Sequence, residues 1–480
     1  MIEFIIKISI LVIKYKNELN KNVDFAYNKL YNMKEKRRLM MRIQSITVGG
    51  FKNLNRSRLE LESICAIVSP NNYGKSNLLE GIDFGIDFIH ASRKERKNMM
   101  SWVRGIPLCP ALENAEYIFE VEFVDDNLGE YRYVKYGFSF KWHRDDETGD
   151  CITDEWLETR ENTSVRYTAY LKRKEGRYRK GKNTSAYRKI DLDSLQLALD
   201  VLGLIEDIEI ADVIKSVHKI AFNVCSSLDL RDNYQPSPIE YAEDENELPE
   251  FDDEDVPRAL AKLRNNAPDS YNVFEDALMT LFPEFTAINL REFALSDEKI
   301  EQLTVTVAGK ELSQDEIKKE IPFRLRERVY RLFVKSMYLN QPVSMASMST
   351  GTKRAIWLLA NVFIANYVKS GIVGIEEIET SIHPKMIRQL LEIVTDALED
   401  TPLIISSHSP YLIQYLKPEK IYIGVPNDKG IAEFKKIQKN KLKYIVSNAR
   451  DFGMSVGEYI FELLSGDSDS YEVLQKFLEG

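Results

Sequence analysis

The stretch SPNNYGKSN at residues 69–77 constrains this chain more than any other part of its sequence. The apolar run ICAIV at residues 64–68 precedes it and is typical of a buried strand, and apolar residues recur at helical spacing after it. A strand, a tight loop with Gly-Lys-Ser and a helix form the layout of a phosphate-binding loop. Ser69 stands at the first position of the usual pattern G-x-x-x-x-G-K-[ST]. We therefore predict a phosphate site in which Lys75 reaches the β- and γ-phosphates and the Ser76 hydroxyl holds Mg²⁺.

Three later stretches have the spacing expected of the second half of an ATP site, and they argue against a chance Gly-Lys-Ser match. In one of them, the apolar strand GIVGI at residues 371–375 ends in the adjacent carboxylates Glu376 and Glu377. Such a pair is costly at a strand end unless it meets a cation or water. Beside a phosphate loop, Glu376 would hold Mg²⁺ through water, and Glu377 would orient and deprotonate the attacking water.

The other two stretches are expected to add a histidine and the N-terminus of a helix to the ATP site. The buried strand within residues 402–410 delivers His408 to its end, where this side chain is a candidate to sense the γ-phosphate or the attacking water. A lone histidine is more often structural. The run MSTGTKR at residues 348–354 opens an apolar helix, so Ser349 and the backbone of Gly351 could donate to a phosphate. A simple Ser or Thr N-cap is the alternative for this run.

In this order, the four motifs resemble the SMC/RecF-like branch of the ABC ATPases. They resemble most closely the predicted AAA-type ATPases of phage-defence and abortive-infection systems, similar to the overcoming-lysogenization-defect group but without its nuclease. The resemblance covers residues 41–110 and about 340–425 well, and the middle of the chain only in style. It implies ATP and Mg²⁺ as ligands, Glu377 as catalytic glutamate, His408 as switch histidine, and Ser76 and Glu376 at the metal. The nucleotide-binding residues that it implies are Ser69, Asn71, Asn72, Gly74, Lys75, Ser76, Asn77, Ser349 and Gly351.

The chain departs from the family pattern at several positions. Ser69 replaces the first Walker A glycine, Thr350 replaces the first signature glycine, and Glu376 is one methylene longer than the usual aspartate. A serine at position 69 is tolerable if its φ is negative. No glutamine can be assigned to the Q-loop. These departures predict slow hydrolysis, or ATP used mainly as a clamp.

The resemblance implies an α/β fold: an ABC-type P-loop ATPase head with a mixed sheet, an antiparallel β lobe and a helical insertion. Alternating aromatic and β-branched residues after position 116 independently favour antiparallel strands. Between the two halves of the site lie roughly 270 residues without heptads, so no long coiled coil is expected. The expected parts are an N-terminal extension (1–40), ATPase lobe I (41–115), a β-rich and helical insertion (116–340), ATPase lobe II (341–430) and C-terminal helices (431–480).

The resemblance also bears on partners, because an ABC signature acts on the ATP of a second subunit. It therefore implies a homodimer or higher oligomer with two ATPs at the interface. Only about 70 residues follow His408, too few for a nuclease after the expected terminal helices. We expect a separate effector, a nuclease of the HNH or TOPRIM type, which this sensor or scaffold controls in antiviral defence. Three other functions stay open: a RecF-like DNA-repair clamp, a weakly catalytic ATP-binding structural protein and, least favoured, a transporter ATPase.

A basic loop within residues 170–182 is the candidate for direct contact with DNA. Clustered Lys and Arg interleaved with Tyr can bind a phosphate backbone and stack on bases. A solvated hairpin tip is the alternative. The candidate side chains are Lys172, Arg173, Lys174, Arg177, Arg179 and Lys180.

The composition limits which partners the protein surface can bind and in which cellular compartment we expect the protein. The formal net charge of −10 argues against a protein that coats nucleic acid with its whole surface, but it leaves room for a local basic patch. The four cysteines are scattered without a C-x-x-C pair, which fits a reducing cytoplasm. No run is long and apolar enough to span a membrane, and residues 1–40 lack the features of a signal peptide. We expect this segment to be an upstream extension of the reading frame or, alternatively, a helix that packs on a partner.

Overall fold

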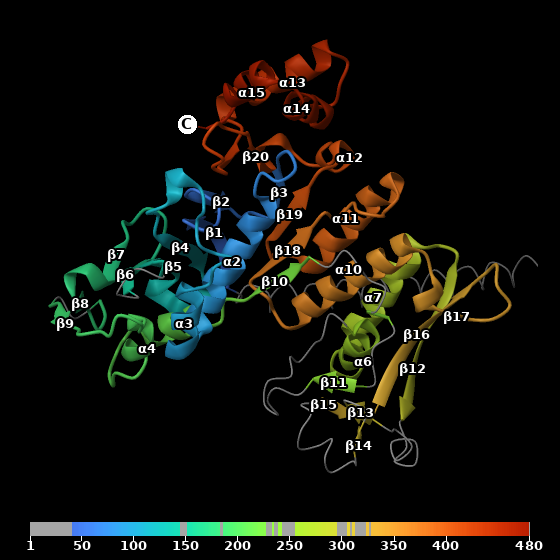
Figure 1. The fold of residues 1–480 in the computed structure, drawn as a ribbon, viewed down its shortest axis with the longest axis horizontal. Helices are drawn as coiled ribbons and strands as arrows, with labels where there is room; N and C mark the ends of the chain where they lie inside the picture. The colour runs from blue at the N-terminus through green and yellow to red at the C-terminus, as the bar shows by residue number, and fades with distance from the viewer. Residues whose placement is uncertain are drawn as a thin grey trace, which may run out of the picture.

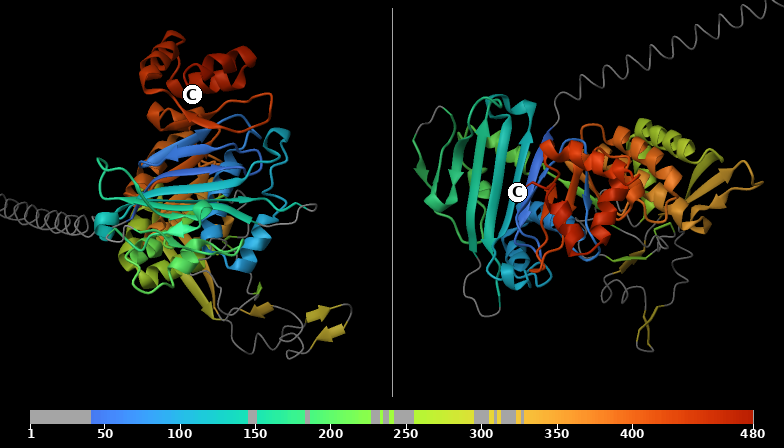
Figure 2. Two further views of the ribbon diagram at one scale, coloured as in Figure 1. Left: turned by 90° about the vertical axis from the view of Figure 1, so that its left-hand side faces the viewer. Right: turned by 90° about the horizontal axis from the view of Figure 1, so that it is seen from above.

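The computed structural model of the chain describes a core of three neighbouring parts, seen side by side in Figures 1 and 2. The predicted N-terminal extension, residues 1–40, lies outside the described residues. The described residues are 41–144, 151–182, 186–226, 233–234, 239–241, 255–294, 305–307, 310–312, 323–325 and 328–479.

The central part is a six-stranded sheet in which neighbouring strands come from distant parts of the sequence. Five strands are parallel, and the last is antiparallel to its neighbour. Four of the five parallel strands are short, largely apolar runs buried on both faces, as expected for a sheet covered on both sides, whereas the edge strand over residues 222–225 is mostly half-buried. The strand order is β10 (Phe222–Cys225), β18 (Ile372–Glu376), β19 (Leu403–Ser407), β3 (Ile64–Val68), β20 (Ile421–Gly424) and β21 (Phe434–Lys436).

Alternate residues of these strands enter two different cores, because successive strand side chains point to opposite faces. From β3, Ala66 and Val68 pack into one core, whereas Cys65 and Ile67 pack into the other. The first core includes α10 (Thr350–Tyr367) and α11 (Pro384–Leu398), and the second includes α2 (Lys75–His90). Helix α2 is thereby buried between the central sheet and a second sheet (Figure 1).

The second sheet is antiparallel and places an aromatic layer against α2. Phe88 of α2 stacks on Phe138 and Phe140, with ring centroids 4.9 and 5.0 Å apart. The sheet runs in the order β2 (Ser57–Glu60), β1 (Arg42–Gly49), β4 (Tyr117–Val124), β5 (Tyr133–Lys141), β6 (Cys151–Arg160), β7 (Thr168–Lys172), β8 (Arg177–Tyr178) and β9 (Arg188–Lys189).

This sheet crosses the boundary that the sequence suggested at residues 115 and 116. Strand β1 pairs antiparallel with β4 over its whole length, so the first ATPase lobe and the start of the insertion form one sheet. Strand β10 shows a second departure, because it lies within the expected insertion and yet forms the edge of the central sheet. The sequence did not reveal either pairing, since both join segments that are far apart in the chain. Along the chain, α3 (Arg93–Met100) lies between α2 and β4, and α4 (Ala198–Leu202) and α5 (Ala211–Val217) lie between β9 and β10.

The third part packs helices against a three-stranded antiparallel sheet beside α10. Its elements are α6 (Val256–Asn266), α7 (Pro268–Leu281), β12 (Phe285–Ala294), β16 (Arg328–Ser336) and β17 (Val343–Ser344), with the short strands β11 (Ile239–Tyr241), β13 (Val305–Val307), β14 (Lys310–Leu312) and β15 (Phe323–Leu325). Beyond β21, the chain ends in three helices above the central sheet (Figure 1): α13 (Leu442–Asp451), α14 (Val456–Ser465) and α15 (Ser468–Gln475).

The fold is the expected α/β head with an antiparallel lobe and a helical insertion. Among the described helices, α10 is the longest at 18 residues, so no long coiled coil extends from the described part of the chain. Nor does any helix among these residues have the length and apolarity to cross a lipid bilayer.

Candidate active site

The phosphate loop joins β3 to α2 through two residues with positive φ. Asn72 has φ 59° and Gly74 has φ 117°, whereas Ser69 lies outside the left-handed region. A side chain at Gly74 would also collide with Asn53, since an added Cβ would lie 2.8 Å from the Asn53 Oδ1. Glycine is therefore required at position 74 for conformation and for space. Serine is compatible with position 69, as predicted from its expected negative φ.

Lys75 is the first residue of α2, and its ammonium group folds back across the loop. Its Nζ donates to the carbonyl oxygens of Ser69 and Pro70, at 2.9 and 3.2 Å, and lies 3.2 Å from the Nδ1 of His408. The side chain is only 6% exposed. Burial lowers the pKa of Lys75 to about 8, although three nearby glutamates act in the opposite direction. The lysine side chain lies at the N-terminus of α2, where phosphate oxygens bind best.

The two residues predicted to hold the metal meet each other across the sheet edge. The Ser76 hydroxyl lies close enough to Glu376, at the carboxyl end of β18, to influence the pKa of this carboxyl group. Burial raises the pKa of Glu376, and the Ser76 hydroxyl lowers it. A hydroxyl and one carboxylate are oxygen donors of the kind that hold Mg²⁺ together with substrate phosphates and water. Within the described residues, no group of three or more His, Cys, Asp and Glu side chains forms a metal site by itself.

Glu377 is fixed by a strained turn immediately after β18. Its φ is 45°, and its N–H donates to the carbonyl oxygen of Ser406 at 3.0 Å. Its carboxylate accepts a hydrogen bond from the Thr380 hydroxyl at 2.9 Å and lies 3.7 Å from the Nε2 of His408. A residue other than glycine held at positive φ is often found where function demands a particular side-chain direction.

His408 therefore lies between the base candidate and the phosphate-binding lysine. One ring nitrogen faces Lys75 and the other faces Glu377. Burial lowers the pKa of His408, Lys75 lowers it further, and Glu377 raises it. The imidazole is neutral at pH 7 as a result. With Lys75 donating to Nδ1, the network assigns the ring proton to Nε2, on the side of Glu377.

Glu379 supports this arrangement, although no pattern in the sequence predicted a role for it. One of its carboxylate oxygens accepts hydrogen bonds from the His408 N–H at 2.8 Å and from the Ser407 hydroxyl at 2.9 Å. Burial raises the pKa of Glu379. Its position three residues after Glu376 was the only available signal, because its partners are set by the pairing of β18 with β19.

Two further supporting residues come from other elements. Arg354 of α10 is buried and donates to the carbonyl oxygen of Glu376 at 2.8 Å, which links the helix after the signature to the metal candidate. Asn53 accepts a hydrogen bond from Asn77 at 2.8 Å and donates to the Tyr73 carbonyl at 3.1 Å, so it fixes the end of the phosphate loop. Asn77 thus acts through Asn53, and Asn71 is an exposed residue of the loop.

The predicted signature residues lie at the exposed start of α10. The Ser349 hydroxyl caps this helix by accepting from the Thr352 N–H at 3.2 Å. Gly351 packs so closely on the Ser381 carbonyl that no side chain would fit there. Among the described residues, no hydrogen bond joins Ser349 or Gly351 to the phosphate loop of the same chain. Both features fit an N-cap and leave the predicted contact with a second subunit as a prediction.

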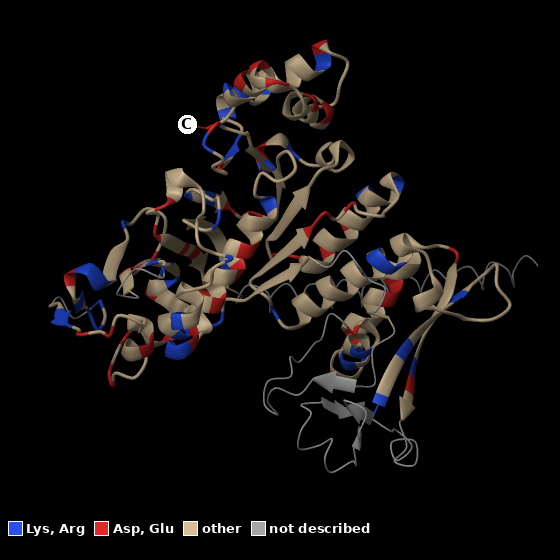
Figure 3. Cartoon of the chain, in the orientation of Figure 1, with Lys and Arg blue, Asp and Glu red and all other residues tan. Residues whose placement is uncertain are grey.

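The candidate DNA loop is largely charge-compensated by its own carboxylates. Figure 3 shows blue and red segments intermixed at this end of the antiparallel sheet. Arg173 is turned inward: its side chain is 9% exposed, donates to the carbonyls of Asp193 and Gln196, and lies 3.5 Å from the Glu155 carboxylate. The other candidates form these contacts: Lys172 with Glu175, Lys174 with Asp154, Arg177 with Glu175 and Tyr187, Arg179 with Tyr187, and Lys180 with the Glu206 carbonyl.

Residues 66–414 match the family described as "AAA domain, putative AbiEii toxin, Type IV TA system". The chain belongs to this AAA family. The match runs from β3 through α12 (Pro410–Ile413), and it includes the phosphate loop, both carboxylates and His408. Nucleotide binding with Mg²⁺ is the common property of such ATPase families.

Several solved structures are similar to the chain in fold. An Smc head bound to the C-winged helix domain of ScpA has 13% identity and a TM-score of 0.45, over 84% of this chain and 99% of that one. An Smc head from Pyrococcus furiosus with an extended coiled coil, bound to the C-terminal domain of ScpA, has 12% identity and a TM-score of 0.44, over 86% and 100%. The SMC head from Thermotoga maritima has 11% identity and a TM-score of 0.38, over 83% and 99%. These similarities in fold are weak. No curated protein matches the chain in sequence.

The lowered pKa of Lys75 predicts that nucleotide binding takes up a proton. At pH 8 about half of the free protein carries a neutral Lys75, and a bound triphosphate favours the charged form, so binding takes up about half a proton. For the same reason, affinity weakens as the pH rises through 8. Calorimetric titration with ATP in buffers of different ionisation enthalpy measures this uptake. The Lys75→Arg variant stays charged and is the matched control without uptake. Wild-type binding with no proton uptake at pH 8 would contradict the buried state of Lys75.

Glu379 predicts a second effect, on turnover rather than on binding. Glu379→Ala leaves the donors of His408 and Ser407 without their acceptor, a loss of about 1–3 kcal/mol. We expect hydrolysis to fall roughly tenfold or more while the Kd for ATP changes less than about twofold. Glu379→Gln keeps an acceptor oxygen and should restore part of the rate. Equal losses of rate and of ATP affinity in both variants would show that Glu379 merely stabilises the fold.

Proposed function

We propose that this AAA-family protein hydrolyses ATP and uses the bound state to control a separate effector in antiviral defence. The observation that carries the proposal is the convergence of Lys75, Glu377 and His408 at the carboxyl ends of neighbouring parallel strands. Ligands of open α/β sheets bind at this edge. The description of the matching family, which names an abortive-infection toxin and a toxin–antitoxin system, supports the defence context.

In the proposed reaction, water attacks the γ-phosphate in line with the leaving ADP oxygen. Glu377 orients the water and accepts its proton, while neutral His408 donates from Nε2 toward the reacting oxygens and Lys75 balances charge on the phosphates. Mg²⁺, held by Ser76 and Glu376, would neutralise the β- and γ-phosphate oxygens when bound. The close support of Glu377 by Thr380 and the Ser406 carbonyl favours positioning as the main source of rate.

The proposed assembly is a homodimer or higher oligomer with ATP between subunits. Support comes from the exposed start of α10, where Ser349 and the helix N-terminus face solvent instead of the phosphate loop. A helix N-terminus of this kind suits an anionic ligand brought by another copy. The effector is proposed to be a nuclease of the HNH or TOPRIM type encoded nearby. Purification with the products of neighbouring genes tests this part, and the absence of any stoichiometric partner would contradict it.

A RecF-like DNA clamp is the runner-up, and the basic loop supports it only weakly. Of its six predicted cations, Arg173 is buried in internal contacts, and Lys172, Lys174 and Arg177 pair with carboxylates. Exposed pairs of this kind can open at small cost, so DNA contact remains a proposal for the exposed members of the loop.

The role of Glu377 gives the sharpest test of the catalytic proposal. Glu377→Gln keeps the size of the side chain and removes the base, so hydrolysis should fall on the order of 10²–10⁴-fold, while ATP affinity stays within about twofold. Single-turnover hydrolysis and equilibrium nucleotide binding measure the two quantities separately. Glu392→Gln on the exposed face of α11 is the matched control and should leave both unchanged. Full hydrolysis by the Glu377 variant would mean that another group is the base.

A further inference from the structure

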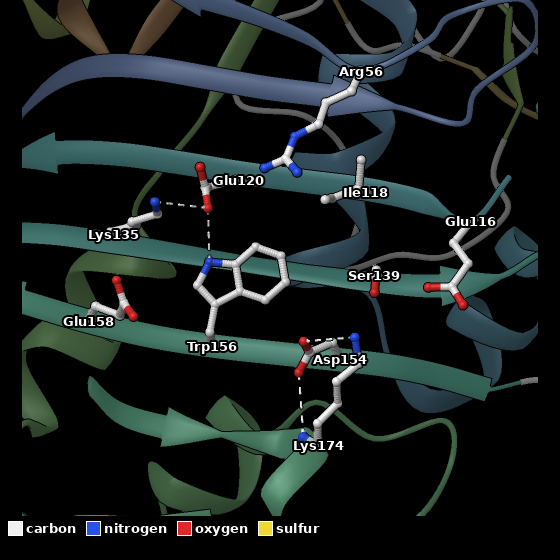
Figure 4. A pocket seen from close by; sticks show the side chains of 10 residues that line it. All are labelled: Arg56, Glu116, Ile118, Glu120, Lys135, Ser139, Asp154, Trp156, Glu158 and Lys174. Carbon is white, nitrogen blue, oxygen red and sulfur yellow. Dashed lines mark hydrogen bonds and ion pairs between the residues drawn. The ribbon is translucent and has the colours of Figure 1, made fainter. Parts of the chain in front are cut away.

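The outer face of the antiparallel sheet carries a groove that the proposed ATPase reaction does not use. Because side chains alternate across a sheet, one face buries aromatic residues against α2 and the opposite face carries mainly polar ones. Trp156 of β6 is the aromatic exception that lines the groove on the polar face. It stands in one row with Glu120 and Gly137, which are cross-strand partners in β4 and β5. The groove has a volume of about 470 Å³ (Figure 4).

The indole ring of Trp156 is fixed flat on the sheet. It lies directly over Gly137, so closely that a side chain at this glycine would overlap the ring. Its Nε1 donates to the Glu120 carboxylate at 3.0 Å. Glu120 is 4% exposed and is held in turn by Lys135 at 3.3 Å. Figure 4 shows the ring face-on in the groove, so this anchoring presents an aromatic plane.

Three charged residues that line the groove have no ion pair among the described residues: Glu116, Arg56 and Glu158. The Glu116 carboxylate accepts a hydrogen bond from the Thr153 hydroxyl at 2.7 Å. Lys135, by contrast, is bound to Glu120, and Lys174 is bound to Asp154 at 3.4 Å. Figure 4 places Arg56 and Glu158 on opposite sides of the Trp156 ring. The groove therefore offers an aromatic plane flanked by one free carboxylate and one free guanidinium.

We propose that this groove binds an arginine side chain of a partner protein. The partner guanidinium would stack on the Trp156 ring and pair with Glu158, and an acidic residue beside it in the partner would pair with Arg56. Indole is the best cation–π acceptor among side chains, and arginine is the cation that most often uses it. Four carboxylates and three cations line the groove, a balance that disfavours a nucleic acid, whose phosphates would meet repulsion. The proposal does not depend on ATP hydrolysis.

The test uses the full chain with its four tryptophans replaced by 5-fluorotryptophan. The fluorine resonance of Trp156 is assigned with the Trp156→Phe variant. The probe is the peptide acetyl-Gly-Arg-Gly-Glu-Gly-amide, and its analogue with citrulline in place of arginine differs only in lacking the guanidinium charge. We expect the arginine peptide to shift the Trp156 resonance and the citrulline peptide to bind about tenfold more weakly.

Single substitutions test separately how the charges of Glu158 and Arg56 contribute to peptide binding. Glu158→Gln should weaken the arginine peptide about as much as citrulline does, whereas Glu161→Gln, just beyond the end of β6, should change nothing. Arg56→Gln should weaken the peptide but lose its effect when the peptide glutamate is replaced by glutamine. Equal binding of both peptides, or no shift of Trp156 by either, would overturn the proposal. A shift of Trp156 by a single-stranded oligonucleotide, and not by the peptide, would replace it with nucleic-acid binding. None of these binding measurements requires ATP, so a negative result would not bear on the proposed ATPase activity.

Discussion

The contact between Lys75 and His408 is the interaction on which the site depends. These residues are 333 positions apart, yet their nitrogen atoms lie 3.2 Å from each other. The contact forms because β3 and β19 are neighbours in a parallel sheet, and parallel strands end at the same edge. Strand β18 lies on the other side of β19 and adds Glu376 and Glu377 to this edge. The burial of three apolar strands, rather than any feature of the loops, thus brings the two halves of the site together.

The charges gathered at this edge balance one another without full pairing. Three glutamates lie within four residues at the carboxyl end of β18, and burial raises the pKa of two of them, Glu376 and Glu379. Burial also lowers the pKa values of Lys75 and His408. Each group is therefore displaced toward its neutral form, which is the expected state of a polar cluster that awaits a highly charged ligand. A bound triphosphate would return Lys75 toward its charged form, and a bound cation would do the same for Glu376.

The sequence was sufficient for the parts of the site that carry their own local pattern. The phosphate loop could be predicted because a strand, Gly74-Lys75-Ser76 and an amphipathic helix are contiguous, and Glu377 and His408 each end an apolar run. Glu379, Arg354 and Asn53 could not be given roles, because each acts on a backbone group or side chain that only the tertiary fold brings near. For the same reason, the sequence did not predict that β1 pairs with β4 or that β10 forms the edge of the central sheet. Likewise, the clustering of Lys and Arg residues in the sequence could not show that the Arg173 side chain points inward to Glu155.

The central claim is that a second subunit completes each ATP site, and a mixing experiment tests it most directly. Lys75→Ala removes the phosphate-binding lysine, and Ser349→Asp keeps the N-cap of α10 while placing a negative charge where a partner's phosphate would bind. Each variant alone should be inactive. An equimolar mixture exchanged to equilibrium should regain about a quarter of the wild-type rate per chain, because half of the dimers are mixed and each has one intact site. A Ser349→Asp protein with full activity alone, or a mixture that stays inactive, would contradict a site shared between subunits.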